Sequence, residues 1–392
     1  MQLIGGWAPA RSVAVARIGV ALAILLEAPG SASTLLRLAE PEVLGAPYAD
    51  WMPRVDATIA LLLIGSWVAS GTLFLVGWHT RIAGSALVVT LAAVLAFDQQ
   101  LYSNHLYLML LASLLLVLAN AGAAHSLDAR RGGRETVPAW PIRLLRVQVS
   151  MVYGFAALAK LNVTFLSGSV VASYLRRDGP LAVPADWRAI EPMLVVSVLA
   201  VCIEAFIAIG VWLPRWRPAA IVSGLALHVG ITIWLTPTIP LFVFSLVMLP
   251  LYVLFIDVRR AMVVVWDDSC SFCAGWVRWF VRLDWLGALR FVPRSKLSAN
   301  GLAVREEDAL RALQVLTPGG RRFGAFAAVI RVAERLPVSY LWAPILRLPP
   351  IARLGERVYG RVAARRTCAV PLPAEAASAP NLARSGAGST DS

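Results

Sequence analysis

The sequence predicts a polytopic α-helical membrane domain with about eight transmembrane helices, followed by a small C-terminal α/β domain. Hydrophobic residues make up 58% of the 392 residues and charged residues only 15%, which is well below the roughly 25% of soluble domains. Long apolar runs dominate the chain up to residue 256, and shorter elements replace them from residue 261. We therefore expect a membrane domain over residues 1–256, an α/β domain over residues 261–367 and a disordered tail over residues 371–392.

Within the membrane domain, the apolar runs are long enough, or nearly long enough, to cross a bilayer as helices. Arginines cluster in alternate connections between these runs, and the other connections are acidic or mixed. Because positively charged connections favour the cytoplasmic side, both termini and the α/β domain are predicted to be cytoplasmic. The long connection at 163–191 is expected to fold as a cap on the outer face. The predicted spans are residues 12–36, 57–78, 82–97, 104–122, 144–165, 192–213, 218–236 and 239–256.

The net charge of +13 allows two interpretations. Basic proteins often bind nucleic acid, but we find no nucleic-acid-binding motif. The distribution of arginines instead matches the orientation bias of a membrane protein. The predicted partner is therefore the lipid bilayer and not nucleic acid. In addition, the segment 341–354 mixes Leu, Ile and Trp with Arg, which is typical of a segment that lies on the membrane surface.

Polar side chains in the apolar runs predict a membrane-buried site. An ionisable group at bilayer depth costs at least about 2.5 kcal/mol on insertion scales, so it indicates function by default. The predicted orientation places four such side chains at a similar depth, which favours a pocket in which Lys160 is a general base. Alternatively, Lys160 extends to the interface and each histidine only bonds a backbone carbonyl. Glu204 and Glu27 are expected to be structural partners of a buried Arg or His. The four candidates are Lys160, Asn104, His105 and His228.

From residue 261 the pattern changes to short strands and helices. A β-branched run is followed by a turn with two cysteines and then by an amphipathic stretch, which predicts strand, turn and helix in that order. The expected elements are strands 262–266, 289–293, 312–317 and 321–325, helices 274–284, 305–311 and 325–335, and a turn at 317–320.

Cys270 and Cys273 form a Cys-x-x-Cys pair at the predicted start of the helix. The partial positive charge of a helix N-terminus favours thiolate over thiol, and the second thiol can resolve a mixed disulfide made by the first. We expect Cys270 to be the nucleophile, since it precedes the helix and should be the more exposed, and Cys273 to resolve. Asp267 either accepts a proton from a thiol or caps the helix. The alternative is a pair of unreactive buried thiols.

The other cysteines and the histidines do not suggest a metal site. A zinc site needs two further ligands at suitable spacing, whereas all four histidines lie in the membrane domain, far from the Cys pair. We therefore predict no metal. Cys202 is expected to be a packing residue, and Cys368 an incidental free thiol.

The membrane domain resembles the HTTM family, the transmembrane fold of vitamin K-dependent gamma-carboxylase. The resemblance implies that Lys160 is the catalytic base that deprotonates a reduced quinone. It also implies that Asn104, His105 and His228 line the same pocket. The motifs that carry it are Trp7–Arg11, Arg17–Gly19, Asn104–Leu108, Gly154–Gly168 and Leu227–His228.

The α/β domain resembles the DCC family of thiol-disulfide oxidoreductases. The family motif Asp-x-x-Cys-x-x-Cys is matched by Asp267, Cys270 and Cys273, with further matches over 277–291 and 358–363. The order of strand, cysteine pair and helix is similar to that of thioredoxin, so the resemblance implies a thioredoxin-like fold and a dithiol–disulfide cycle. The expected partner of this cycle is a thiol reductant protein.

These observations predict a membrane-bound thiol-disulfide oxidoreductase whose membrane domain binds a quinone or another apolar ligand. A quinone is the cofactor that the resemblance suggests. A second hypothesis is a carboxylase-like membrane enzyme that oxidises a quinone with Lys160 as base. A third is a non-enzymatic membrane scaffold or lipid-binding protein in which the Cys pair has no role.

Overall fold

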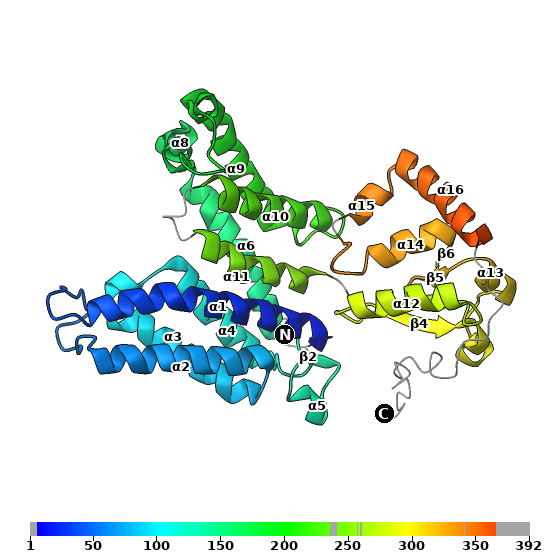
Figure 1. Ribbon diagram of the computed structural model, residues 1–392, viewed down its shortest axis with the longest axis horizontal. Helices are drawn as coiled ribbons and strands as arrows, with labels where there is room; N and C mark the ends of the chain where they lie inside the picture. Colours follow the sequence, from blue (N-terminus) through cyan, green and yellow to red (C-terminus); the bar gives the residue numbers. More distant parts are fainter. Residues whose placement is uncertain (1–5, 236–240, 257, 259–260, 341, 366–392) are drawn as a thin grey trace. The chain divides into compact units, whose positions relative to one another are not determined.

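The computed structural model describes residues 6–235, 241–256, 258, 261–340 and 342–365. The chain forms two compact units, one that ends at Ile256 and one that begins at Asp257 (Figure 1). The predicted tail at 371–392 and Cys368 lie outside the described residues.

The first unit is built from long apolar helices, as the sequence predicts. In the described part of the chain, a helix lies at each of the eight predicted positions. Six of them are long and apolar enough to cross a membrane, and two are shorter, so the chain is an integral membrane protein. The helices are α1 Ala10–Leu38, α2 Ala57–Val76, α3 Thr80–Phe97, α4 Asn104–Leu118, α6 Trp140–Ala159, α9 Ile190–Gly210, α10 Arg217–Trp234 and α11 Leu241–Leu251, the last continued by the 3₁₀ turn η3 Tyr252–Phe255.

Helix α1 is the centre of this unit. It packs against α2, α4 and α11, and Figure 1 shows α1 and α2 side by side. Arg17 of α1 is fully buried and donates a hydrogen bond of 2.7 Å to the carbonyl oxygen of His125. Two short strands that the sequence did not predict, β1 Trp7–Pro9 and β2 Thr136–Pro138, pair antiparallel. They tie the start of α1 to the start of α6.

The predicted span 144–165 is not one helix. Helix α6 ends at Ala159, and Lys160 is its C-terminal cap instead of a residue within it. The side chain of Asn162 accepts a hydrogen bond of 2.9 Å from the amide of Phe165, and so begins a new short helix. Asparagine is a favoured N-cap, which explains the break. The connection predicted to be a cap contains α7 Val163–Leu166, α8 Ser169–Tyr174 and the 3₁₀ turn η2 Ala185–Arg188.

The second unit is the predicted α/β domain. Its four-stranded sheet has the order β4-β3-β5-β6, with β3 parallel to β4 and antiparallel to β5. A strand–helix–strand unit followed by a hairpin and a helix is the thioredoxin-like arrangement that the sequence predicts. The elements are β3 Met262–Trp266, α12 Ser271–Leu283, β4 Leu289–Pro293, α13 Glu306–Arg311, β5 Gln314–Leu316, β6 Arg322–Gly324 and α14 Ala325–Ala333.

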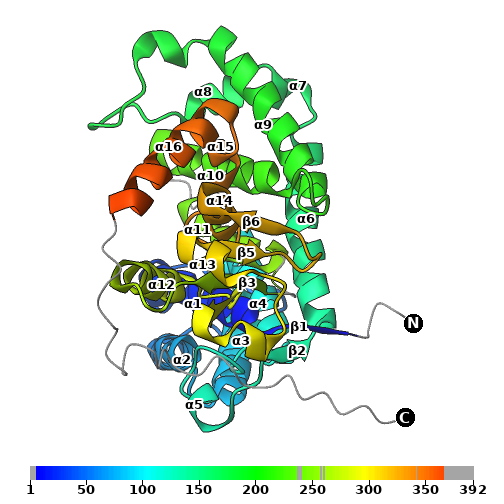
Figure 2. The same ribbon diagram turned by 90° about the vertical axis from the view of Figure 1, so that its right-hand side faces the viewer.

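Two apolar clusters cover the two faces of this sheet, whose strands β3, β5 and β6 lie next to one another in Figure 2. Val264 packs on one face with Phe280 of α12 and Val332 of α14. Val265, its neighbour in the strand, packs on the other face with Ala309 of α13. Alternate residues of a strand point to opposite faces, so one β-branched run supplies both cores. Two further helices follow, α15 Ala343–Leu346 and α16 Pro349–Arg365.

Candidate functional site

The Cys pair follows the central strand of the sheet. Strand β3 has the sequence Met-Val-Val-Val-Trp and pairs on both sides, so it is almost entirely buried. β-Branched side chains favour such a strand. Its carboxyl end delivers Asp267 to the edge at which open α/β sheets carry their sites. Helix α12 then begins immediately after the turn 267–270.

The side chain of Asp267 shapes this turn. One carboxylate oxygen accepts hydrogen bonds from the Ser269 amide at 3.1 Å and from the Ser269 hydroxyl at 2.7 Å. This is an Asx-turn, in which an aspartate replaces a backbone acceptor. Cys270 is the N-cap residue of α12, and its amide donates to the Asp267 carbonyl at 3.3 Å. Cys270 makes no side-chain cap hydrogen bond, and the Asp267 carboxylate bonds Ser269 within the turn and Arg294 outside it.

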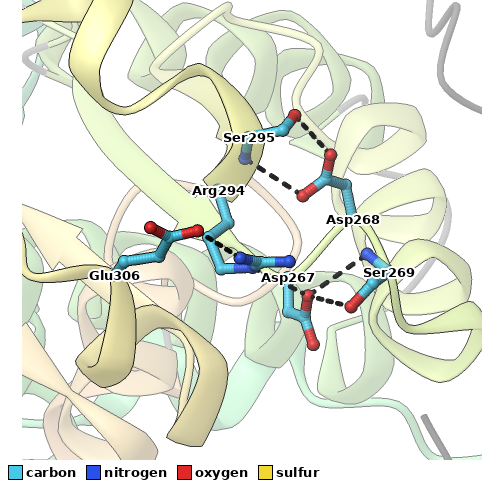
Figure 3. Close-up of polar contacts among 6 residues, drawn as sticks. All are labelled: Asp267, Asp268, Ser269, Arg294, Ser295 and Glu306. Carbon is cyan, nitrogen blue, oxygen red and sulfur yellow. Dashed lines mark hydrogen bonds and ion pairs between the residues drawn. The ribbon is translucent and has the colours of Figure 1, made fainter. Parts of the chain in front are cut away.

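A second segment braces the turn from outside (Figure 3). Asp268 accepts two hydrogen bonds from Ser295, one from the amide at 3.2 Å and one from the hydroxyl at 2.5 Å. Arg294 lies 3.3 Å from a carboxylate oxygen of buried Asp267, and it also pairs with Glu306 of α13. The Cys turn is therefore fixed to the segment that follows β4.

The exposure of the two cysteines is the reverse of the prediction. Cys270, which was expected to be the more exposed, is fully buried, and Cys273 is partly exposed. Cys270 lies between the braced turn and the first turn of α12. Cys273 lies one helical turn later, at the edge of a cluster with Trp266 and Val277. A solvent-borne reagent therefore meets Cys273 first.

In the membrane unit, Lys160 is held in an ion pair. Its amine lies 2.5 and 2.7 Å from the two carboxylate oxygens of Glu204 on α9. The Glu204 side chain is 8% exposed and that of Lys160 is 28% exposed. The partner of Glu204 is thus this lysine, where an Arg or His had been predicted. The ion pair therefore joins the end of α6 to the middle of α9.

His228 belongs to a different buried cluster. Its Nε2 lies 2.6 Å from the hydroxyl of Tyr153 on α6, and its Nδ1 lies 2.8 Å from the hydroxyl of Ser245 on α11. The hydroxyl of Tyr153 is also hydrogen-bonded to that of Tyr252. Room for Tyr252 comes from Gly224 of α10, because a Cβ there would lie 1.8 Å from the tyrosine oxygen. His228 thus bonds side chains, not the backbone carbonyl of the alternative prediction.

His105 and Asn104 occupy a third position, at the start of α4. The Nε2 atom of His105 lies 3.3 Å from a carboxylate oxygen of Glu27 on α1 and 3.2 Å from the Ser103 hydroxyl. The Glu27–His105 pair matches the expectation of a structural partner for Glu27. Asn104 is exposed, and its side-chain oxygen accepts a long hydrogen bond of 3.5 Å from Tyr102.

The four membrane candidates therefore do not form one contact network. Among the described residues, no hydrogen bond or ion pair joins any two of Lys160, Asn104, His105 and His228. Tyr153 of α6 and Lys160, the C-cap of that helix, are seven residues apart, which is nearly two turns. The two side chains therefore lie on one face of the helix, with their backbone positions about 10 Å apart. The residues that sequence reasoning missed are Tyr153, Tyr252, Ser245, Asp268, Arg294, Ser295 and Glu306.

Comparison with known families agrees with both units. Residues 8–259 match the HTTM domain family, and residues 264–369 match the family of DCC1-like thiol-disulfide oxidoreductases. No curated protein and no solved structure matched the chain. The first match covers more than half of the chain and contains all eight long helices, and the second contains the braced Cys turn. The chain therefore belongs to the HTTM family and carries a DCC1-like thiol-disulfide oxidoreductase domain after its membrane domain.

Proposed function

We propose that the protein is a membrane-bound thiol-disulfide oxidoreductase in which Cys270 and Cys273 cycle between dithiol and disulfide. The observation that carries this proposal is the position of the pair. Cys270 is the N-cap of α12 at the carboxyl end of the central strand, and Cys273 lies one turn into the same helix. The helix N-terminus favours a thiolate there. The match to DCC1-like oxidoreductases supports this chemistry at the level of the domain.

The cycle balances as a two-electron exchange. The thiolate of Cys270 attacks a disulfide of the substrate, which forms a mixed disulfide and releases one substrate thiolate. Cys273 then attacks the Cys270 sulfur, so the second substrate thiol leaves and a Cys270–Cys273 disulfide remains. A partner protein with a dithiol reduces this disulfide and is itself oxidised. Asp267 is the proposed proton acceptor for the attacking thiol.

The burial of Cys270 adds one requirement to this cycle. Because Cys270 is buried, its sulfur must become exposed before a substrate disulfide reaches it. Next to the partly exposed Cys273, the rings of Phe272 and Trp276 are 43% and 54% exposed, with centroids 6.4 Å apart. These rings offer an apolar contact for the incoming partner. We place this site on the cytoplasmic side, because the arginine-rich connections favour that orientation.

For the membrane domain, we propose that a quinone or another apolar ligand binds near Lys160, with Asn104, His105 and His228 as further candidates. The ion pair of Lys160 and Glu204 supports a functional role. Charged groups among membrane helices cost free energy, so they are rare and usually mark functional sites. The same pair supports the second hypothesis, in which Lys160 is the base in a quinone-oxidising reaction. To act as a base, the lysine must first lose its proton, and the nearest acceptor is the Glu204 carboxylate.

Trapping experiments test the thiol proposal. In the full chain, Cys273→Ser should accumulate a mixed disulfide at Cys270 when it is incubated with an oxidised model dithiol, and Cys270→Ser should not. Cys202→Ser is the matched control and should leave exchange unchanged. Trapping only in the Cys270→Ser variant would mean that Cys273 is the nucleophile and Cys270 the resolving thiol. The absence of trapping in both variants would contradict the proposal and favour a scaffold or lipid-binding protein.

Quinone assays test the membrane proposal separately. Oxidation of a reduced quinone by the full chain, with dioxygen supplied as the electron acceptor, should fall about tenfold or more in Lys160→Ala and Glu204→Gln, because each change breaks the ion pair. Equal rates in the wild type and both variants would remove Lys160 from the mechanism. That result would leave the thiol proposal untouched, since the trapping experiment does not depend on the membrane domain.

A further inference from the structure

Helix α16 at the end of the α/β domain exposes an apolar stripe beside a stripe of arginines. Leu354, Val358 and Val362 recur every four residues and are 60%, 48% and 42% exposed. An arginine precedes each of them, so the arginines form a second stripe about 100° around the helix. A further arginine follows at the same spacing. The arginine stripe consists of Arg353, Arg357, Arg361 and Arg365.

Another side of α16 is attached to its own domain. Gly355 lies so close to α14 that a Cβ there would be 2.0 Å from the ring of Phe326. The hydroxyl of Tyr359 accepts a hydrogen bond of 3.0 Å from the amide of Leu313. These contacts fix the rotation of α16 about its axis. The arginine stripe therefore lies opposite these contacts, and the exposed apolar stripe lies between the arginines and the attached side.

The charge of the exposed side has one sign. Among the described residues, none of the four stripe arginines has a hydrogen-bond or ion-pair partner. The one acidic residue of α16, Glu356, accepts a hydrogen bond of 3.2 Å from the amide of Ala327, in the first turn of α14. Its charge is thus directed to that helix terminus. Apolar residues with arginines beside them are the pattern of helices that lie in the interface of an acidic bilayer.

The α/β domain is tethered to a membrane-spanning chain, because only residues 256–261 separate η3 of the membrane unit from β3. The apolar exposure continues upstream of α16, where Trp342, Ile345 and Leu348 are 62%, 45% and 50% exposed. Exposed apolar residues in such a row mark an interaction surface.

We propose that α16 docks on the surface of the membrane, with Leu354, Val358 and Val362 in the headgroup–acyl boundary and the arginine stripe on acidic lipid headgroups. The consequence is that the α/β domain, and with it the Cys pair, is held against the bilayer. The proposal does not depend on the redox activity of Cys270 and Cys273.

Site-directed spin labelling of the full chain tests this docking. All four cysteines are replaced by Ser, and a single label is placed at Val358→Cys or, as a matched control, at Gly360→Cys. Gly360 lies on another side of α16, and a Cβ there meets open space. The protein is reconstituted in nanodiscs that contain 30% phosphatidylglycerol. The label at position 358 should be more accessible to oxygen than to a water-soluble nickel chelate, and the label at 360 should show the reverse.

Two comparisons make the outcome decisive. Replacement of Arg353, Arg357 and Arg361 by Gln should lower the fraction of molecules whose label at position 358 is immersed in the bilayer. Use of purely zwitterionic nanodiscs should have the same effect. We expect about a fivefold change in partitioning per arginine. Free access of the chelate to position 358 in acidic nanodiscs would overturn the proposal. Protection from both oxygen and chelate would also overturn it, because it would mean that protein covers this face.

Discussion

Ser295 donates two hydrogen bonds to the carboxylate of Asp268, a residue 27 positions earlier in the chain. Asp268 lies in the turn that leads to Cys270, and Ser295 lies in the 3₁₀ turn η4 Arg294–Lys296 after β4. The pairing fixes the Cys turn to a separate segment of the domain.

This bracing should control the reactivity of Cys270. An exposed hydrogen bond contributes about 0.5–1.5 kcal/mol, so its loss should raise the open fraction of the turn about 2- to 10-fold. Alkylation of Cys270, followed by mass spectrometry, should accelerate by that factor in Asp268→Ala and Ser295→Ala. Ser298→Ala, an exposed serine whose side chain makes no described hydrogen bond, is the control. Unchanged alkylation in all three variants would show that the turn does not limit access.

The Lys160–Glu204 pair should behave as a coupled unit in stability measurements. Lys160→Met leaves an unpaired carboxylate among apolar helices, and Glu204→Leu leaves an unpaired amine. Each single change should cost about 1–3 kcal/mol of the free energy of unfolding, and the double variant should recover most of the loss. Thermal unfolding in detergent should be measured for the wild type, the two single variants and the double variant. Additive losses would mean that the two groups do not interact in solution.

Gly224 should be required for the buried tyrosine cluster. A Cβ at this position would lie 1.8 Å from the Tyr252 hydroxyl, so Gly224→Ala must displace the ring from Tyr153. We expect a loss of about 1–3 kcal/mol, the usual cost of overpacking. Gly230→Ala on the same helix meets its nearest atoms, in Trp234, at 3.4 Å. It should be neutral or slightly stabilising, because alanine favours helix. Equal melting temperatures for the two variants would contradict the packing described here.

Asp128 should make the start of α3 sensitive to acid. Burial disfavours its charged form, but hydrogen bonds from the Thr80 hydroxyl and from the Thr80 and His79 amides outweigh this effect. They lower the pKa of Asp128 from its usual 3.8. A lowered pKa stabilises the fold above pH 3.8, and this contribution is lost as the pH falls through the folded-state pKa.

Hydrogen exchange of residues 79–82, corrected for the intrinsic effect of pH, measures this sensitivity. Protection should be constant at neutral pH and fall below pH 3.8. Asp128→Asn should weaken protection at neutral pH to the level that the wild type reaches in acid, and should remove the pH dependence. Asp50→Asn, a change in an exposed connection, should leave the wild-type profile. A profile that Asp128→Asn does not alter would assign the acid sensitivity to another group.

Local sequence patterns predicted the α/β domain well. The β-branched run at 262–266 and the cysteine motif after it placed strand β3 at its observed bounds and the start of α12 within a few residues. Both features depend on neighbours in the chain, namely strand propensity and a helix N-terminus. The burial of Cys270 and the bracing of its turn could not be predicted in this way, because both arise only in the folded domain. Asp267 and Asp268 of the turn bond Arg294 and Ser295, more than 20 residues away.

The membrane site shows a similar limit. Orientation and depth placed Lys160, Asn104, His105 and His228 at a similar level, but depth does not determine which helix faces which. The partners that define their environments, Glu204, Glu27 and Tyr153, come from other helices. The helix break at Lys160 does have a local signal, the N-cap residue Asn162, which the hydrophobic pattern obscured.

The most direct test of the account is a redox titration of the full chain. The protein is equilibrated in glutathione buffers of increasing oxidation, quenched with an alkylating reagent and analysed by mass spectrometry. We expect one two-electron transition in which Cys270 and Cys273 together lose their thiols and form a disulfide with each other. Either single variant, Cys270→Ala or Cys273→Ala, should abolish the transition. Two thiols that remain reactive in the most oxidising buffer would contradict the central claim.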